Sequence, residues 1–342
     1  MECMSSTHFF EGVEKLLEIW FTQSKNSYGN GDARSISPEK WKVCLQLAKV
    51  EVMDYFEYGE QGAFILSESS MFVSKYRIIL KTCGTSLCLN ALPYIIELVK
   101  KECGLDTVAD CFYSRKNFMK PDHQPHPHHA FENEVIFLNQ TLSSYLASYC
   151  LGQMNSDCWF MCTLNHSGNT SLIGTSQPDQ TLEILMTGLD SEVMAHFKSA
   201  DRSGKKKTSE DVTRDSGISD LISNSKINAA LFNPCGYSMN GLLPNEQYWT
   251  IHVTPEAEFS YVSFETNLDV IDYTNLIIDV TSLFRPQRFV MTLFRNHLSS
   301  VDLTPWNLPQ GPLIQNYRRL DKQIAYLDQY CLYYLNFEKA GL

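Results

Sequence analysis

Short segments rich in β-branched and aromatic residues recur along this chain, each bounded by residues that favour turns. Such segments predict β-strands, whereas apolar residues spaced three and four apart predict helices. The predicted strands are residues 63–66, 71–73, 77–80, 159–164, 248–253, 259–264 and 288–294. The predicted helices are residues 38–50, 86–103, 180–185 and 273–283, and the segment 14–22 is ambiguous between helix and strand.

The predicted strands outnumber the helices and mostly follow one another directly. This order predicts antiparallel sheet with helices on its outer faces, an α+β architecture. No glycine-rich loop follows a strand, so nothing supports a doubly wound nucleotide-binding fold. Two polar stretches, residues 23–37 and 198–216, are expected to be surface loops. No repeat or long linker is visible, so we expect a single domain over residues 1–342.

The composition narrows the class of protein. Hydrophobic residues make up 44% of the 342 residues, so the chain can bury a sizeable core. The net charge of −11 argues against nucleic acid and anionic membranes as partners, because both repel acidic proteins. The N-terminal residues resemble no signal peptide, and no apolar stretch is long enough to cross a bilayer. We therefore expect a cytosolic protein with 11 reduced cysteines, whose spacing predicts no metal site.

The segment LSESSMFVSKYRIILKTCGT, residues 66–85, combines paired serines with a cysteine. On its own it predicts a polar hairpin with a buried cysteine, since paired serines are common in turns. Residue types alone therefore give this segment no reactive role.

Seven ordered blocks make the chain resemble the eukaryotic S-adenosylmethionine decarboxylases, which are pyruvoyl-dependent proenzymes. The first block is LSESSMFVS with KTCGT, and the others are HFFEG (8–12), FYSRKNFMKP (112–121), MNSDCW (154–159), SQPDQTLEILM (176–186), FNPCGYSMNG (232–241) and YWTIHVTPE with FSYVSFETN (248–267). The resemblance implies a four-layer αββα sandwich with two face-to-face antiparallel sheets and helices outside. It also implies a homodimer of cleaved protomers.

The resemblance implies that the chain cleaves itself between Glu68 and Ser69, leaving residues 1–68 as the β chain and 69–342 as the α chain. Ser69 would become a pyruvoyl group, a self-derived cofactor that forms a Schiff base with the substrate amine and accepts the electrons released by decarboxylation. The product would be the aminopropyl donor for spermidine and spermine.

Several residues match the family's catalytic and substrate-binding positions. His252 resembles the base of the cleavage reaction and Ser238 the hydroxyl that assists it, while Cys83 resembles the acid that reprotonates the substrate carbon. The remaining catalytic candidates are Glu11 and Glu14. The implied substrate-binding residues are Phe10 and Phe232, which stack on the adenine, Glu256, which binds the ribose, and Glu68.

A set of carboxylates lies in apolar contexts, where burial is costly unless cations pair with them. These acids are Glu14, Glu18, Asp179, Glu183 and Glu265, and Lys15 and Lys81 are available as cations. If the segment 14–22 is a strand, its two acids share one face. The resemblance implies a putrescine site formed by Glu18, Asp179, Glu183, Glu265, Phe112, Phe294 and Tyr330. We expect this diamine to stimulate both cleavage and catalysis.

Other interpretations remain open. The histidines of HQPHPHH, residues 123–129, could suggest a metal site, but the prolines favour an exposed tract without a role. The chain could instead be an uncleaved, non-catalytic regulatory relative, although it retains Ser69, Cys83, Ser238 and His252. A thiol hydrolase using Cys83 and His252 would need an oxyanion hole that the sequence does not reveal.

Overall fold

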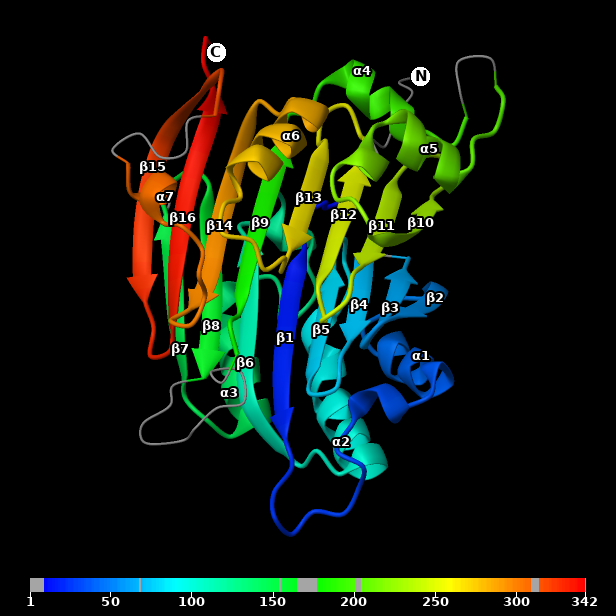
Figure 1. Cartoon of the computed structure of the whole chain (residues 1–342), viewed down its shortest axis with the longest axis vertical. Coiled ribbons are helices and arrows are strands. Elements are labelled where there is room, and N and C mark those ends of the chain that lie inside the picture. Colours follow the sequence, from blue (N-terminus) through cyan, green and yellow to red (C-terminus); the bar gives the residue numbers. More distant parts are fainter. Residues whose placement is uncertain are drawn as a thin grey trace, which may run out of the picture.

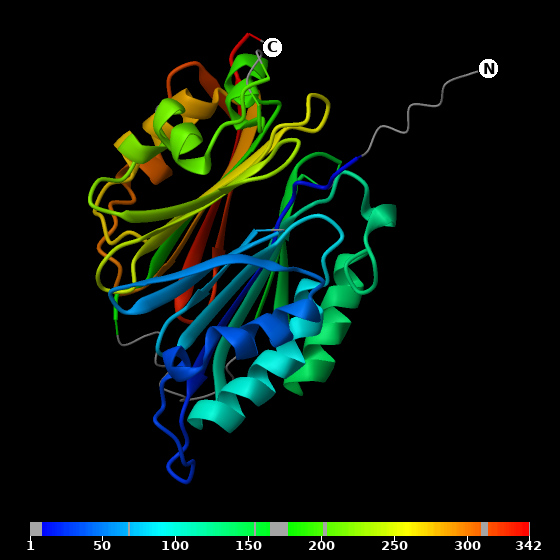
Figure 2. The same ribbon diagram turned by 90° about the vertical axis from the view of Figure 1, so that its right-hand side faces the viewer.

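The computed structural model describes residues 9–67, 69–153, 155–164, 177–200, 204–308 and 314–341. Its strands form two eight-stranded antiparallel sheets that lie face to face, and the helices cover the outer faces (Figures 1 and 2). This arrangement confirms the expected αββα sandwich.

The first sheet is built from the N-terminal half of the chain, with the strand order β2-β3-β4-β5-β1-β6-β8-β7. Its strands are β1 Lys15–Thr22, β2 Val52–Tyr58, β3 Gln61–Leu66, β4 Ser69–Val73, β5 Arg77–Thr82, β6 Thr107–Lys116, β7 Leu146–Gly152 and β8 Cys158–Leu164. The helices of this half are α1 Pro38–Gln46, α2 Leu92–Cys103 and α3 Phe131–Leu142. The ambiguous segment near the N-terminus is thus the central strand β1.

The second sheet repeats this order in the C-terminal half as β10-β11-β12-β13-β9-β14-β16-β15. Its strands are β9 Gln180–Thr187, β10 Lys226–Leu231, β11 Tyr237–Leu242, β12 Tyr248–Thr254, β13 Tyr261–Thr266, β14 Arg288–Asn296, β15 Tyr317–Tyr326 and β16 Tyr330–Lys339. Its helices are α4 Ser191–Met194, α5 Ser209–Asp215, α6 Thr274–Phe284 and α7 Thr304–Asn307. The two halves therefore share one topology, a duplication that the sequence analysis did not detect.

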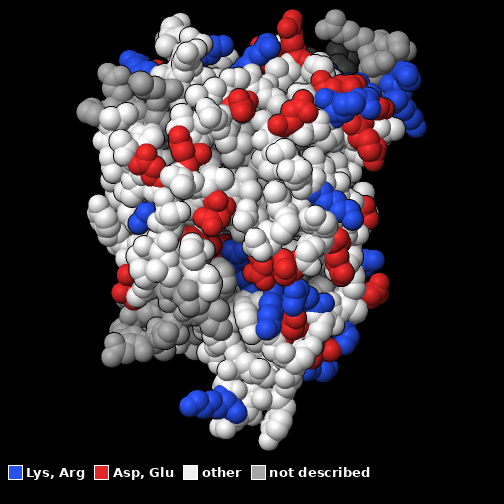
Figure 3. Space-filling view, in the orientation of Figure 1, with Lys and Arg blue, Asp and Glu red and all other residues white. Residues whose placement is uncertain are grey.

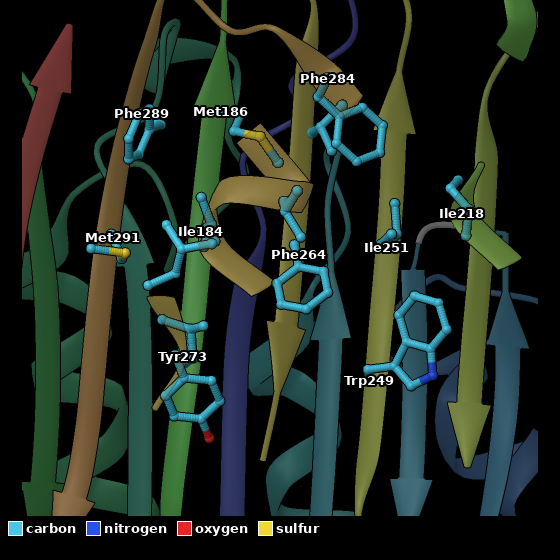
Figure 4. Packing of buried hydrophobic residues seen from close by; sticks show 14 of the residues in the cluster. Ile184, Met186, Ile218, Trp249, Ile251, Phe264, Tyr273, Phe284, Phe289 and Met291 are labelled. Atoms are coloured by element: carbon cyan, nitrogen blue, oxygen red, sulfur yellow. The ribbon is translucent and has the colours of Figure 1, made fainter. Parts of the chain in front are cut away.

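Each sheet buries an apolar outer face beneath its own helices. In the first half, Leu17 and Ile19 of β1 belong to a cluster that also includes apolar residues of α1 and α2. In the second half, Ile184 and Phe264 belong to a cluster with Phe284 of α6 (Figure 4). Alternation along the strands then directs the intervening residues into the space between the sheets.

Two predictions of local structure were wrong. Residues 180–185 belong to strand β9 rather than to a helix, because they pair with β13 on one side and β14 on the other. Six of the eight residues of β9 are buried, so the run lacks the two-residue alternation of a half-exposed strand. The expected loop 198–216 contains helix α5, which begins at a capping box formed by Thr208 and Asp211.

The surface shows no segregation of charge by sign on the face seen in Figure 3, where acidic and basic side chains are interspersed. Within the described parts of the chain, no helix is long and apolar enough to span a membrane.

Candidate active site

Ser69, the first residue of β4, has a strained backbone. Its φ of +133° lies in a region that residues other than glycine rarely adopt, and its side chain is buried. The Ser69 hydroxyl donates a hydrogen bond to Glu14 Oε1 at 2.5 Å. Strain and a carboxylate partner thus coincide at the residue that the sequence analysis placed at the cleavage point. Glu68 lies outside the described residues.

Glu14 precedes β1 and is held between the two sheets. Its Oε2 lies 3.4 Å from Lys81 Nζ of β5, and the same ammonium pairs with Glu265 Oε2 of β13 at 2.9 Å. Burial alone would raise the pKa of Glu14, but Lys81 and His252 outweigh this effect and lower the pKa to about 2. The carboxyl group of Glu14 is therefore ionised in the folded protein at neutral pH.

His252 on β12 faces the same space from the second sheet. Its Nδ1 lies 2.9 Å from the hydroxyl of Ser238, its cross-strand neighbour on β11. Its Nε2 lies 2.8 Å from Thr250 Oγ1 and 3.2 Å from Ser70 Oγ. Burial lowers the pKa of His252 to about 4 even though Glu14 acts to raise it, so the imidazole is neutral at pH 7.

A pocket of about 340 Å³ opens beside these groups. Its lining includes Phe10, Ser69, Cys83, Phe232, Ser238, His252 and Glu256. Seven of the predicted catalytic and substrate-binding residues therefore surround one cavity, with two phenylalanine rings for a flat apolar group and a carboxylate for a polar one. Cys235 also lines the pocket.

Glu11 occupies a different position from the other predicted catalytic residues. Its Oε2 accepts hydrogen bonds from the backbone amides of Met119 at 2.9 Å and Lys120 at 3.1 Å. Its own backbone carbonyl accepts a hydrogen bond from the amide of Gly84, next to Cys83. These contacts join the N-terminal segment to the loop after β6 and to the turn that follows Cys83.

A second cluster of acids lies farther along the space between the sheets. Arg77 of β5 pairs with Asp179 at 3.4 Å and lies 3.9 Å from Glu18 of β1. Tyr330 OH donates to Asp179 at 3.1 Å, and Trp20 Nε1 donates to Glu18 at 2.6 Å. The rings of Phe112, Phe294 and Tyr330 contact one another, with Phe294 and Tyr330 stacked 4.4 Å apart.

Glu183 of β9 joins this cluster from the second sheet. It is the cross-strand neighbour of Glu265, and its carboxylate accepts hydrogen bonds from Trp159 Nε1 at 3.2 Å and Thr292 Oγ1 at 3.5 Å. Burial raises the pKa of Glu183 to about 8, against the opposing effect of Lys81. Burial likewise raises the pKa of Glu18 to about 8 and raises that of Asp179, although Arg77 opposes both shifts. Burial thus favours the protonated forms of these three carboxyl groups.

Sequence reasoning missed four polar residues that complete these two clusters. Arg77 supplies the cation for Glu18 and Asp179, while Ser70, Asn240 and Thr250 surround His252. The two-residue period of the strands could have predicted Asn240 and Thr250. Asn240 follows Ser238 by two residues and Thr250 precedes His252 by two, so each shares a strand face with a predicted catalytic residue.

Lys15 does not pair with the acids between the sheets. It follows Glu14 directly and points to the opposite face of β1, where its Nζ donates to Gly84 O at 3.1 Å and Gln124 Oε1 at 3.3 Å.

The expectation of an exposed histidine tract at residues 123–129 was wrong for His128. This side chain is fully buried, and its Nδ1 lies 2.8 Å from Glu134, which also pairs with Arg115 at 2.8 Å and accepts from Tyr113 OH. His128 thus belongs to a buried network on the outer side of the first sheet. In the described portion of the molecule, no three His, Cys, Asp or Glu side chains gather in a way that would hold a metal ion.

A strained serine held by a carboxylate, beside a neutral histidine in an aromatic-lined pocket, is the kind of site at which a chain can modify its own backbone. The family model described as Adenosylmethionine decarboxylase matches residues 7–338. The chain therefore belongs to the adenosylmethionine decarboxylase family.

Named relatives and a solved structure agree with this assignment. An S-adenosylmethionine decarboxylase proenzyme from Xenopus laevis is 49% identical, over 98% of this chain and 97% of that protein. A proenzyme of the same name from Drosophila melanogaster is 42% identical, over 98% of both chains. The crystal structure of a Trypanosoma brucei AdoMetDC-delta26 monomer superposes with a TM-score of 0.59 at 25% identity, covering 79% of this chain and 99% of that chain.

Proposed function

We propose that this protein cleaves itself before Ser69 and then decarboxylates S-adenosylmethionine with the pyruvoyl group formed from that serine. The observation that carries the proposal is the strained backbone of Ser69. The Ser69 hydroxyl donates a hydrogen bond to Glu14, and Ser69 lines the same pocket as Cys83, Ser238 and His252. The product would be the aminopropyl donor for spermidine and spermine.

Cleavage begins with an acyl shift. The Ser69 oxygen attacks the carbonyl carbon of Glu68, so that a C–O ester bond forms and the C–N amide bond breaks, while the hydroxyl proton moves to the released nitrogen. An ester is less stable than an amide, and relief of the unfavourable φ at Ser69 would help to offset that cost. The Glu14 carboxylate, hydrogen-bonded to the hydroxyl, holds the oxygen in place and favours departure of its proton.

The ester is then opened by elimination. His252 takes the proton from the α-carbon of residue 69, the C–H electrons form a Cα=Cβ double bond, and the Cβ–O bond breaks to leave Glu68 with a free carboxylate. Water then hydrolyses the resulting dehydroalanine. The oxygen of water replaces the nitrogen on the α-carbon, the nitrogen departs as ammonia, and a ketone remains. A neutral imidazole is required for the proton transfer, and the depressed pKa of His252 supplies it at pH 7. Residues 1–68 and 69–342 would then be separate chains of one folded unit.

The residues around Ser69 fit a pyruvoyl group, because the site provides a buried serine with a strained backbone and an adjoining pocket for the substrate. That group would accept the electron pair that remains on the substrate carbon when carbon dioxide leaves. Phe10 and Phe232 would hold the adenine and Glu256 the ribose hydroxyls, and aromatic faces also attract the sulfonium cation. Cys83, buried at the pocket wall, would return a proton to the substrate carbon.

The acid cluster between the sheets is proposed to bind putrescine. Glu18, Asp179, Glu183 and Glu265 are buried there or nearly so, and burial raises the pKa values of the first three despite the neighbouring cations. A diamine has two ammonium groups joined by an apolar chain, which matches carboxylates set beside the Phe112, Phe294 and Tyr330 rings. The cluster reaches Ser69 through Lys81, which pairs with both Glu265 and Glu14.

The oligomeric state and the cellular location of the protein remain predictions. We propose a homodimer of cleaved protomers, with two α and two β chains, that works in the cytosol without a metal ion. Sedimentation velocity of the cleaved protein tests the assembly, because a single species at the protomer mass would exclude a stable dimer.

The proposed function is tested by release of carbon dioxide from S-adenosylmethionine labelled in its carboxyl group. The purified protein is expected to release label, faster with putrescine, whereas Ser69→Ala is expected to release none. A non-catalytic relative would release none in either form. A thiol hydrolase would leave the carboxyl group intact while consuming another substrate.

A further inference from the structure

The hydrogen bonds around His252 decide which of its ring nitrogens carries the proton, and Asn240 sets their direction. Asn240 Nδ2 donates to the backbone carbonyl of Phe64 on the opposite sheet at 3.0 Å. A carbonyl can only accept, so this contact fixes the orientation of the amide group. Asn240 Oδ1 therefore points toward Ser70 and Thr250 as an acceptor, at 2.6 Å and 3.0 Å from their hydroxyl oxygens.

Both of these hydroxyl protons have acceptors other than the imidazole. The Thr250 hydroxyl lies 2.8 Å from the backbone carbonyl of Met239 as well as 3.0 Å from Asn240 Oδ1. The Ser70 hydroxyl donates to Asn240 Oδ1. Each hydroxyl has a single proton to donate, so the oxygen atoms of Ser70 and Thr250 offer only lone pairs to His252.

His252 Nε2 is consequently surrounded by acceptors. Thr250 Oγ1 lies at 2.8 Å, Ser70 Oγ at 3.2 Å and the ionised Glu14 Oε1 at 3.7 Å. An unprotonated nitrogen here would face three oxygen atoms and would leave the buried hydrogen-bonding capacity of the ring unused, which costs about 1–3 kcal/mol. A proton on Nε2 satisfies the arrangement, and a neutral imidazole then has a lone pair on Nδ1.

We infer that Ser70, Asn240 and Thr250 are positioning residues that hold His252 in the Nε2–H tautomer, so that Nδ1 is the atom that accepts the α-proton of residue 69. Nδ1 faces Ser238 Oγ at 2.9 Å, and Ser238 and Ser69 line the same pocket. The Ser238 hydroxyl donates to Nδ1 in the resting site and must turn aside or pass a proton along when the base acts. The assignment of Nδ1 as the base rests on the proposed function, whereas the tautomer itself does not.

The tautomer is measured directly by ¹⁵N–¹H correlation spectra of histidine-labelled Ser69→Ala protein, in which no cleavage disturbs the site. The His252 signals are identified by their loss in His252→Gln. The expected result is a protonated Nε2 and an unprotonated Nδ1 at pH 7. A protonated Nδ1 in this protein would overturn the inference.

Matched variants connect the tautomer to the chemistry. Thr250→Val removes the nearest acceptor of the Nε2 proton, so we expect an Nδ1–H signal to appear in the Ser69→Ala background. In the chain with Ser69 intact, self-cleavage should slow by about 10²-fold, the lower end of what a positioned general base contributes. Thr250→Ser keeps the hydroxyl and is expected to restore both the tautomer and most of the rate. Thr281→Val removes a buried hydroxyl from α6, which donates to helix carbonyls, and serves as the control.

Asn240→Leu is a second variant should Thr250→Val fold poorly, because it releases the Ser70 proton toward Nε2 and is expected to cause the same change of tautomer. If either folded variant retains both the Nε2–H tautomer and the parent cleavage rate, the positioning role is refuted. A parent protein that shows the Nε2–H tautomer but never cleaves would overturn the proposed function while the tautomer assignment stands.

Discussion

Binding of putrescine should depend steeply on pH, because its proposed site holds protons when it is empty. Glu18 and Glu183 both have a pKa raised to about 8 by burial. At pH 6 to 7 these carboxyl groups are therefore largely protonated in the empty site. Two ammonium groups placed beside them favour the ionised forms and expel protons.

The size of the effect follows from linkage. Each proton released on binding makes the dissociation constant tenfold tighter per pH unit, equivalent to 1.36 kcal/mol. Release of one to two protons predicts that binding tightens by about 10- to 100-fold between pH 6 and pH 7. The dependence should flatten above pH 8, where the carboxyl groups of the empty site have already lost their protons.

The assay is titration calorimetry with the Ser69→Ala protein, in buffers that differ in ionisation enthalpy, which counts the protons released. Glu183→Gln should bind putrescine more weakly at pH 8 and should release about one proton fewer at pH 6.5. Glu192→Gln, on the exposed surface of α4, provides the matched control and should behave as the parent. A dissociation constant that does not change with pH, with no proton exchanged with buffer, would refute this account of the cluster.

Three further predictions concern stability and substrate binding. Without putrescine, the protein should lose thermal stability as pH rises from about 7 to 9, because a carboxyl group whose folded pKa exceeds its unfolded value stabilises the fold only while protonated. Below pH 7 the neutral buried His252 and His128 act in the opposite sense. Scanning calorimetry should show a smaller loss in Glu183→Gln, and an equal loss would contradict the assignment. Arg115→Met should lower the free energy of unfolding by about 3 kcal/mol, because it leaves the Glu134 carboxylate buried without its guanidinium partner. Adding Glu134→Gln should recover part of that loss in denaturant unfolding, and additive losses would show that the pair is not coupled. Phe232→Leu should raise the KM for S-adenosylmethionine about fivefold while self-cleavage proceeds at the parent rate, since a stacked ring contributes about 1 kcal/mol beyond its buried area. A normal KM in steady-state kinetics would remove Phe232 from the adenine site.

The αββα fold class could be predicted from the sequence because the ordered motifs resemble a known family, and many strands could be predicted because they are rich in β-branched and aromatic residues and are bounded by residues that favour turns. Strand β9 was misread because both of its faces are covered, one by the helical layer and the other by the opposing sheet, so Leu182, Ile184 and Leu185 leave no alternation. Helix α5 was missed although the capping pair Thr208 and Asp211 was visible.

The candidate residues of the pocket were found through motifs, but their partners were not. Arg77 meets Asp179 across 102 positions of the chain, and Ser70 meets Asn240 across 170. Such contacts exist only once the two sheets are stacked, and periodicity within a strand cannot give the register between sheets. The duplicated topology was hidden for a similar reason, because equal strand order does not require equal side chains.

The most direct test of the account is intact mass spectrometry of the purified protein after incubation with S-adenosylmethionine and a borohydride reductant. The account predicts two chains, residues 1–68 and 69–342, with the larger one beginning in a pyruvoyl group and gaining a trapped substrate adduct. A single uncut chain without an adduct, under conditions in which the protein is folded, would contradict it.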